Sequence, residues 1–337
     1  MGTNSSTPRR TYTVAPTMAS STPGELSYTS AAAFRTALKA RFTAIAKQDP
    51  RYTVSELQRQ FAYDRILSRC FSTDDAQRWV LKGAGALLAR LPDARHSKDI
   101  DLHYAELAAG AEEATGALVA AADRDLGDHF RFEVTKTTPL QEAAKGRRIH
   151  LSAYLGGLYA AFHVDVVVGT PMSGWPDLVP PLTPLHIEGL VRPLYRAFPL
   201  PDHCADKLCA VIETHEQAGG IHVSSRVKDL VDLALIARSQ TVDGPALRAA
   251  IVLGAAHRGL PLPAAFAVPD WEAWRTGFTK TISAAPGQSM SFADGLHLVQ
   301  RFLDPVLAGP VNARWHPQTG WNAAGAPDPA ASEGTTA

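Results

Sequence analysis

Hydrophobic residues recur at helical spacing in the first part of the chain. Phe34, Leu38, Phe42 and Ile45 lie on one face of a helix predicted over residues 31–46. Leu57, among others, continues this spacing in a second helix predicted over 55–68. Both stretches are therefore predicted to be packing helices.

Strand patterns are grouped together in the middle of the chain. The apolar run 79–82 ends at a Gly-Ala-Gly turn and is followed by the helix-forming residues 86–91, which predicts a strand, a tight turn and a helix. An Ala- and Glu-rich helix is predicted over 105–122. Further strands are predicted over 100–104, 129–135, 149–155 and 158–168. The regular strand–helix alternation of a doubly wound sheet is missing from this pattern.

The pattern becomes helical after a Pro-rich stretch. Helices are predicted over 202–215, 226–238, 244–254 and 292–307. We therefore predict an α/β domain over 26–175, a connector over 176–201 and a helical domain over 202–315. The segments 1–25 and 316–337 are rich in Gly, Pro, Ala, Ser and Thr, and we predict that both are disordered tails.

Composition and charge exclude several classes of protein. The 337 residues are 45% hydrophobic, which is sufficient for a large core, and their formal net charge is +0. No apolar run reaches the length of a membrane helix, and the N-terminus lacks the apolar core of a secretory signal, so we expect a cytoplasmic protein without a membrane partner. The three cysteines lack a matching set of metal ligands and are expected to be reduced packing residues.

Two aspartates on one strand indicate metal chemistry. Asp99 and Asp101 are two residues apart, so in a strand their carboxylates point to the same side. Asp165 is a third acid, which interrupts an apolar strand and needs a partner or a metal. Clustered carboxylates repel one another and suit Mg²⁺ or Mn²⁺. A solvated strand end or a helix cap is the alternative for Asp99 and Asp101, but the nearby glycine turn and the acid on a later strand favour a site.

Four motifs in order resemble those of AbiEii-type nucleotidyltransferase toxins, a family of the polymerase-β-like superfamily that includes the mycobacterial MenT toxins. The motifs are Lys82-Gly83-Ala84-Gly85-Ala86-Leu87, Arg95-His96-Ser97-Lys98-Asp99-Ile100-Asp101, Ala205-Asp206-Lys207-Leu208-Cys209-Ala210 and Ser225-Arg226-Val227-Lys228-Asp229-Leu230-Val231-Asp232-Leu233. The resemblance covers residues 79–239. It implies an α+β fold with a mixed sheet and flanking helices, followed by a helical C-terminal half.

The resemblance also implies roles for individual residues. Catalytic roles fall on Asp99, Asp101, Lys207 and Asp229, metal binding on Asp99, Asp101 and Asp165, and nucleotide binding on Lys82, Gly83, Gly85, Ser97, Lys207, Arg226 and Lys228. The family's turn usually reads Lys-Gly-Gly-Thr or similar, so here backbone N–H groups would replace a hydroxyl contact with the triphosphate. Without the resemblance, a surface lysine is the alternative for Lys207. For Lys228 with Asp232, the alternative is a helix-surface ion pair.

The expected activity is transfer of a nucleoside monophosphate from an NTP to RNA, as the resemblance to MenT toxins implies, with the tRNA 3′ end as acceptor and an antitoxin as partner. Ser97 is a candidate for regulatory phosphorylation. Transfer to a protein or small molecule, or a non-catalytic nucleotide-binding module, are the alternatives. Arg95, Lys98, Arg147 and Arg148 are candidates for contacts with the acceptor or the triphosphate, or are solvated surface residues.

Overall fold

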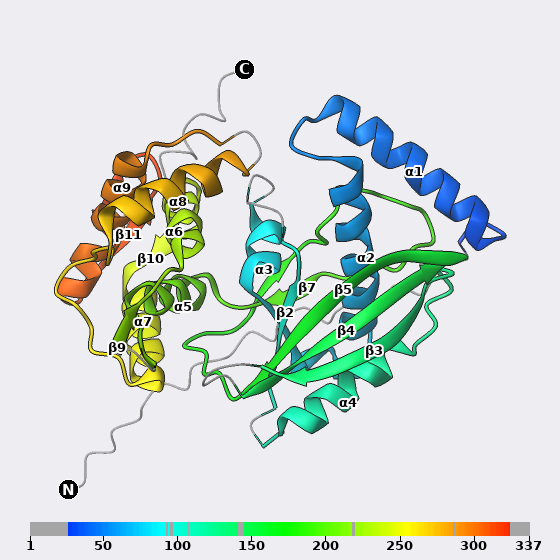
Figure 1. Cartoon of the computed structure of the whole chain (residues 1–337), viewed down its shortest axis with the longest axis horizontal. Helices are drawn as coiled ribbons and strands as arrows, with labels where there is room; N and C mark the ends of the chain where they lie inside the picture. Colours follow the sequence, from blue (N-terminus) through cyan, green and yellow to red (C-terminus); the bar gives the residue numbers. More distant parts are fainter. Residues whose placement is uncertain are drawn as a thin grey trace, which may run out of the picture.

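A mixed sheet forms the centre of the first part of the molecule (Figure 1). The computed structural model describes residues 26–91, 94, 97–106, 108–140, 145–217, 220–285 and 288–323. The seven strands are β1 (Trp79–Lys82), β2 (Ile100–Tyr104), β3 (Arg131–Pro139), β4 (Gly146–Leu155), β5 (Gly157–Val168), β6 (Asp177–Val179) and β7 (Tyr195–Ala197). Their order is β3-β4-β5-β2-β1-β7-β6, in which β2 is parallel to β5 and β1 to β7. This arrangement confirms the predicted α+β class.

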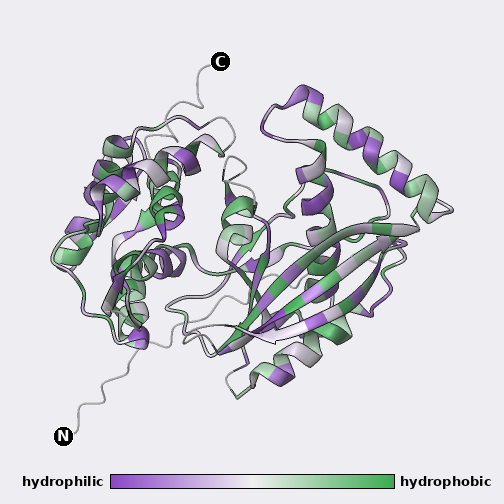
Figure 2. Cartoon of the chain, viewed as in Figure 1, coloured by the Kyte–Doolittle hydropathy of each residue, from purple (hydrophilic) through white to green (hydrophobic). Residues whose placement is uncertain are grey.

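Helices cover one face of this sheet. They are α1 (Ala31–Gln48), α2 (Val54–Phe71) and α4 (Ala111–Ala122), and a short 3-10 helix, Asp74–Arg78, leads into β1. The helix α2 begins with a capping box in which Thr53 and Glu56 satisfy each other's backbone N–H groups. Apolar residues alternate with polar ones along β4, and Figure 2 shows this alternation on the strands in front of α2. The apolar face packs against the helices in one buried cluster.

The second part of the molecule is mainly helical. It contains α5 (Leu200–Ile212), α6 (Val227–Ser239), α7 (Gly244–Arg258), α8 (Trp271–Ser283) and α9 (Phe292–Ala308), with the short strands β8 (Thr214–Gln217), β9 (Gly220–Val223), β10 (Val242–Asp243), β11 (Ala313–His316) and β12 (Gly320–Ala323). These helices bury a second hydrophobic cluster. None of the described helices is long and apolar enough to cross a membrane.

One helix contributes to both clusters. The helix α3 (Gly83–Arg90) follows β1 directly and lies between the two parts of the molecule in Figure 1. Ala86 and Ala89 belong to the cluster under the sheet, whereas Leu87 and Leu88 belong to the cluster of the helical part. The turn at the start of α3 is therefore anchored from both sides.

Several predicted boundaries are wrong. The helix predicted over 105–122 begins at Ala111, because the backbone N–H of Ala105 still bonds to Arg78 in continuation of the sheet. The predicted helix over 202–215 runs from Leu200 to Ile212, because the backbone of Glu213 is extended.

The connector and the C-terminal tail also differ from prediction. The stretch 176–201 contributes β6 and β7 to the sheet: β7 pairs with β1, and β6 pairs with β7. The predicted tail over 316–337 starts too early: the hairpin of β11 and β12 continues to Ala323, with Trp315 and Trp321 packed beside the α9 ring of Phe302. Residues 1–25 and 324–337 lie outside the described residues.

Candidate active site

The turn between β1 and α3 lies against an acid of the neighbouring strand. Lys82, the last residue of β1, is in register with Asp101 of β2. Gly83 adopts a φ of 57°, and a Cβ built on it would lie 1.8 Å from the Asp101 Oδ2 atom. Only glycine fits there, since the conformation and the close approach both exclude a side chain. The N-terminus of α3 and the Asp101 carboxylate are thus brought together.

Three carboxylates lie near one another at this edge of the sheet. Asp101 is in register with Asp165 of β5, and Asp99 immediately precedes β2. Burial, together with the negative charges of Asp99 and Asp165, raises the pKa of Asp101 to about 6. The three acids are therefore not all readily ionised unless a positive charge lies between them. A bound metal ion would supply that charge.

Asp99 is held by a hydroxyl and a ring. The Ser97 hydroxyl donates to the Asp99 Oδ1 atom at 2.7 Å, and the His163 Nε2 atom lies 3.5 Å from its Oδ2 atom. Burial raises the pKa of Asp99, but the Ser97 hydrogen bond and the positive charge of His163 more than offset it, so the net shift is downward. Asp99 remains ionised next to Asp101. Ser97 itself is only 5% exposed.

Asp165 has an arginine partner. Arg148 of β4 donates two hydrogen bonds to its carboxylate, at 2.8 and 2.7 Å. Asp165 was expected to need a partner or a metal, and Arg148 is that partner. Among the described residues, no group of three His, Cys, Asp or Glu side chains is arranged to enclose a metal ion. Metal binding by Asp165 stays a prediction, and it requires the carboxylate to exchange its contact with Arg148.

The oxygen donors nevertheless suit a hard divalent cation. Asp99 and Asp101 offer carboxylates from one strand and its preceding residue, and the repulsion that raises the pKa of Asp101 is the interaction that a cation would remove. The residues present therefore fit Mg²⁺ or Mn²⁺, with Asp99 and Asp101 as the first ligands.

The helical part contributes a buried lysine. Lys207 of α5 is 5% exposed, and its ammonium donates to Asp229 at 2.9 Å and to Asp232 at 2.5 Å. Arg226 donates to the other oxygen of Asp229 at 2.7 Å. Although burial opposes both charged forms, the ion pairs raise the pKa of Lys207 and lower that of Asp229.

These contacts decide between two interpretations of the helix motif. Lys207 is not a surface lysine, and Asp232 is a buried partner of Lys207 rather than part of a surface pair. The ammonium faces two carboxylates, so Lys207 positions Asp229 in this arrangement. Its predicted contact with a phosphate stays a prediction.

Two further lysines border the site. Lys228 of α6 is exposed, and its positive charge helps to lower the pKa of Asp99 and offsets part of the rise in the pKa of Asp101, which places the helical part beside the acids. Lys82 is only 8% exposed, and its ammonium lies 4.3 Å from the centre of the Phe198 ring. No described acid forms an ion pair with Lys82, so its charge faces the site uncompensated by direct contact.

The predicted basic residues separate in the structure. Arg148 is on the face of the sheet that carries the acids, whereas Arg147, the next residue, forms an ion pair with Glu112 of α4 on the opposite face. Lys98 is exposed close to Asp99, and Arg95 lies outside the described residues. His163 was missed in the sequence, although its position two residues before Asp165 on one strand could have indicated it.

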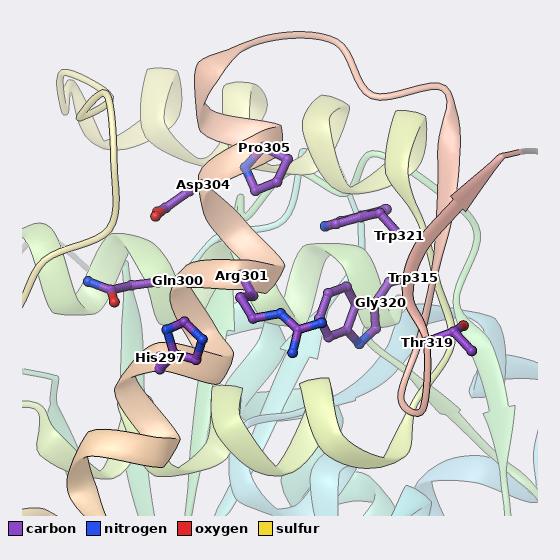
Figure 3. Close-up of a pocket in the computed structure, with 9 residues that line it drawn as sticks. All are labelled: His297, Gln300, Arg301, Asp304, Pro305, Trp315, Thr319, Gly320 and Trp321. Atoms are coloured by element: carbon purple, nitrogen blue, oxygen red, sulfur yellow. The ribbon is translucent and has the colours of Figure 1, made fainter.

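A pocket elsewhere is separate from these residues. It has a volume of about 390 Å³ and lies between α9 and the β11–β12 hairpin, where Figure 3 shows Arg301 reaching toward Trp315. None of the acids or lysines described above lines it. The residues that carry the family motifs therefore define a different site, at the junction of β1, β2, β5 and α6.

A glycine turn opening a helix, acids on adjacent strands and basic residues from a following helical part define a nucleotidyltransferase. A family model described as "Nucleotidyl transferase AbiEii toxin, Type IV TA system" matches residues 65–303. The chain belongs to this family of toxins, which implies an NTP substrate and an antitoxin. No curated protein sequence matches the chain.

Solved structures show weaker similarity. JHP933 from Helicobacter pylori is 14% identical with a TM-score of 0.40, and the match covers 76% of this chain and 93% of that chain. The CD-NTase CdnG from Bradyrhizobium diazoefficiens, solved in complex with GTP, is 13% identical with a TM-score of 0.20, covering 75% and 90%. Because both TM-scores are low, the assignment depends on the family model.

Proposed function

We propose that this nucleotidyltransferase transfers a nucleoside monophosphate from an NTP to RNA, with the tRNA 3′ end as the acceptor. The observation that carries the proposal is the contact between the Gly83 turn and Asp101, with Asp99 and Asp165 beside it. A turn at a helix N-terminus binds phosphates, and adjacent acids bind the divalent ions that accompany a triphosphate.

Asp99 and Asp101 would hold the metal ions, with Asp165 joining them when Arg148 releases it. Bound Mg²⁺ or Mn²⁺ would polarise the α-phosphate and stabilise the departing pyrophosphate. The N–H groups at the start of α3, including those of Gly83 and Gly85, would orient the triphosphate, since no hydroxyl side chain is available in this turn.

The cations around the site would neutralise the triphosphate from two sides. Lys82 approaches from the sheet, and its contact with the Phe198 ring leaves its ammonium free to bind an anion. Arg226 and Lys228 approach from the start of α6. Lys207 would act through Asp229, whose carboxylate fixes the guanidinium of Arg226. We therefore describe Lys207 as a positioning residue.

Ser97 is the proposed site of regulatory phosphorylation. Its hydroxyl donates to Asp99 at 2.7 Å, so a phosphate on that oxygen would break the hydrogen bond and place about −1.5 to −2 charges beside the carboxylate. The expected effect is loss of metal and NTP binding. Because Ser97 is buried, modification requires the loop before β2 to open.

The test uses purified full-length protein, Mg²⁺ and each of the four NTPs labelled at the α-phosphate, with a total tRNA pool as acceptor. We expect label on RNA with the wild-type protein and at least a 10²-fold loss with Asp99→Asn, the scale of losing one electrostatic contribution to catalysis. Asp123→Asn is the matched control, because this exposed aspartate lies at the end of α4. Label on protein, or on no acceptor, would reject the RNA acceptor in favour of the alternatives.

A further inference from the structure

The face of the sheet opposite the helices carries polar residues in cross-strand rows. Along β4 these are Arg148, His150, Ser152 and Tyr154, which alternate with the buried residues Ile149, Leu151, Ala153 and Leu155 of the other face. Directly paired residues on neighbouring strands share a face. The rows therefore extend across β3, β4 and β5.

Two of these rows begin at the acids. One runs from Asp101 through Asp165 and Arg148 to Thr138 of β3. The other passes from His163, beside Asp99, to His150 and then to Lys136 on the edge strand β3. With strands about 4.8 Å apart, the rows cover roughly 14 Å from β2 to β3. This is the outer face, defined by Lys136, His150, His163 and Arg148.

The outer face has the chemistry of a surface for single-stranded nucleic acid. His150 and His163 lie with ring centres 5.7 Å apart, and Lys136 is exposed without an ion pair to a described acid. Burial and the neighbouring charge of His163 lower the pKa of His150, which favours the neutral ring that stacks on bases. Unpaired bases bind to such rings, and phosphates to an exposed ammonium.

We propose that the outer face binds the single-stranded 3′ end of the acceptor RNA, with the nucleotide nearest His163 presenting its hydroxyl to Asp99 and Asp101. The inference rests on the proposed function and specifies where its acceptor lies. Charge complementarity at Lys136 and continuity of the rows with the acids support RNA as the occupant. Arg147 takes no part, because it pairs with Glu112 on the opposite face.

The experiment measures the KM for RNA and the KM for NTP separately. His150→Ala removes a stacking ring and is expected to raise the KM for RNA by roughly 5- to 150-fold, because stacking contributes about 1–3 kcal/mol per base. Lys136→Ala should weaken RNA binding and lower the slope of log affinity against log salt by about 0.7, the value for one phosphate contact with a single strand. Neither variant should change the KM for NTP.

Arg147→Ala is the matched control, since it removes a cation from the same strand but from the opposite face. Anisotropy of a labelled single-stranded RNA gives the binding readout in the absence of NTP. If the wild-type protein labels RNA and both outer-face variants behave like Arg147→Ala, the outer face is rejected while the proposed function stands. If the wild-type protein labels no RNA, both proposals are rejected.

Discussion

Replacing Lys207 with methionine tests the buried ion cluster directly. The substitution keeps the length of the side chain but leaves Asp229 and Asp232 facing each other without the ammonium that donates to both. Removing one partner of a buried ion pair costs about 3–5 kcal/mol, because the remaining charge stays desolvated and loses the attraction of its partner. Arg226 still pairs with Asp229, so we expect the lower end of this range.

Equilibrium unfolding in urea, followed by circular dichroism, measures this loss. For 337 residues the unfolding entropy is about 0.7 kcal/mol/K, so a loss of about 3 kcal/mol should also lower the melting temperature by roughly 4 °C. Lys280→Met is the control, since Lys280 is an exposed lysine on α8 of the same helical part. A second substitution, Asp232→Asn, should recover part of the loss, because it removes one of the two like charges that the Lys207 ammonium bridges.

The loss should depend on pH with a defined sign. The pKa of Asp229 is lowered in the folded protein, so its contribution is complete above its unfolded value of about 3.9 and is lost as pH falls further. The pKa of Lys207 is raised, so its contribution is complete below about pH 10.4 and is lost at higher pH. The contribution of this pair to the stability of the wild type should therefore be constant from about pH 5 to 10. A change no larger than that of Lys280→Met at pH 7 would refute the buried cluster.

Two further predictions concern the Gly83 turn and its neighbouring acid. Gly83→Ala should reduce stability by about 1–2 kcal/mol for the positive φ alone, and it should abolish activity by displacing the Asp101 carboxylate. Gly116→Ala is the control: there is open space around this glycine in α4, so alanine should stabilise the protein by about 0.5–1 kcal/mol. Equal melting temperatures for the two variants would contradict this prediction. Asp101→Asn should raise the melting temperature in EDTA and more at pH 8 than at pH 5, because the pKa of Asp101 is raised to about 6 and ionisation above that value costs stability. Mg²⁺ should then stabilise the wild type but not this variant, and equal stabilisation of both by Mg²⁺ would exclude Asp101 as a ligand.

The long, regular patterns of the sequence predicted the core of the fold. The strands that became β1, β2, β4 and β5 alternate or are uniformly apolar over their length, and each was recognised. The strands β6, β7 and β12 are only three or four residues long, and β7 depends on pairing with β1 far away in the chain, so local patterns could not identify them. The helix α8 was missed as well.

The acids of the candidate site could be identified from the sequence, but their partners could not. Asp99, Asp101 and Asp165 come together because two strands happen to be adjacent and in register. The partner of Asp165 is Arg148, which requires knowledge of the antiparallel pairing of β4 with β5. Alternation along the strand predicts that Arg147 and Arg148 point to opposite faces. Which of them points toward the acids is known only when the face that packs against the helices is known.

The helix α3 makes separation of the two parts costly. Leu87 and Leu88 bury their side chains among residues of the helical part, and each such leucine contributes about 1.5–3 kcal/mol. A fragment ending in the stretch 176–201 would expose them to water, directly behind the Gly83 turn. The chain should therefore unfold in a single transition, and we expect a fragment cut between the sheet and the helices to be less stable than the whole chain.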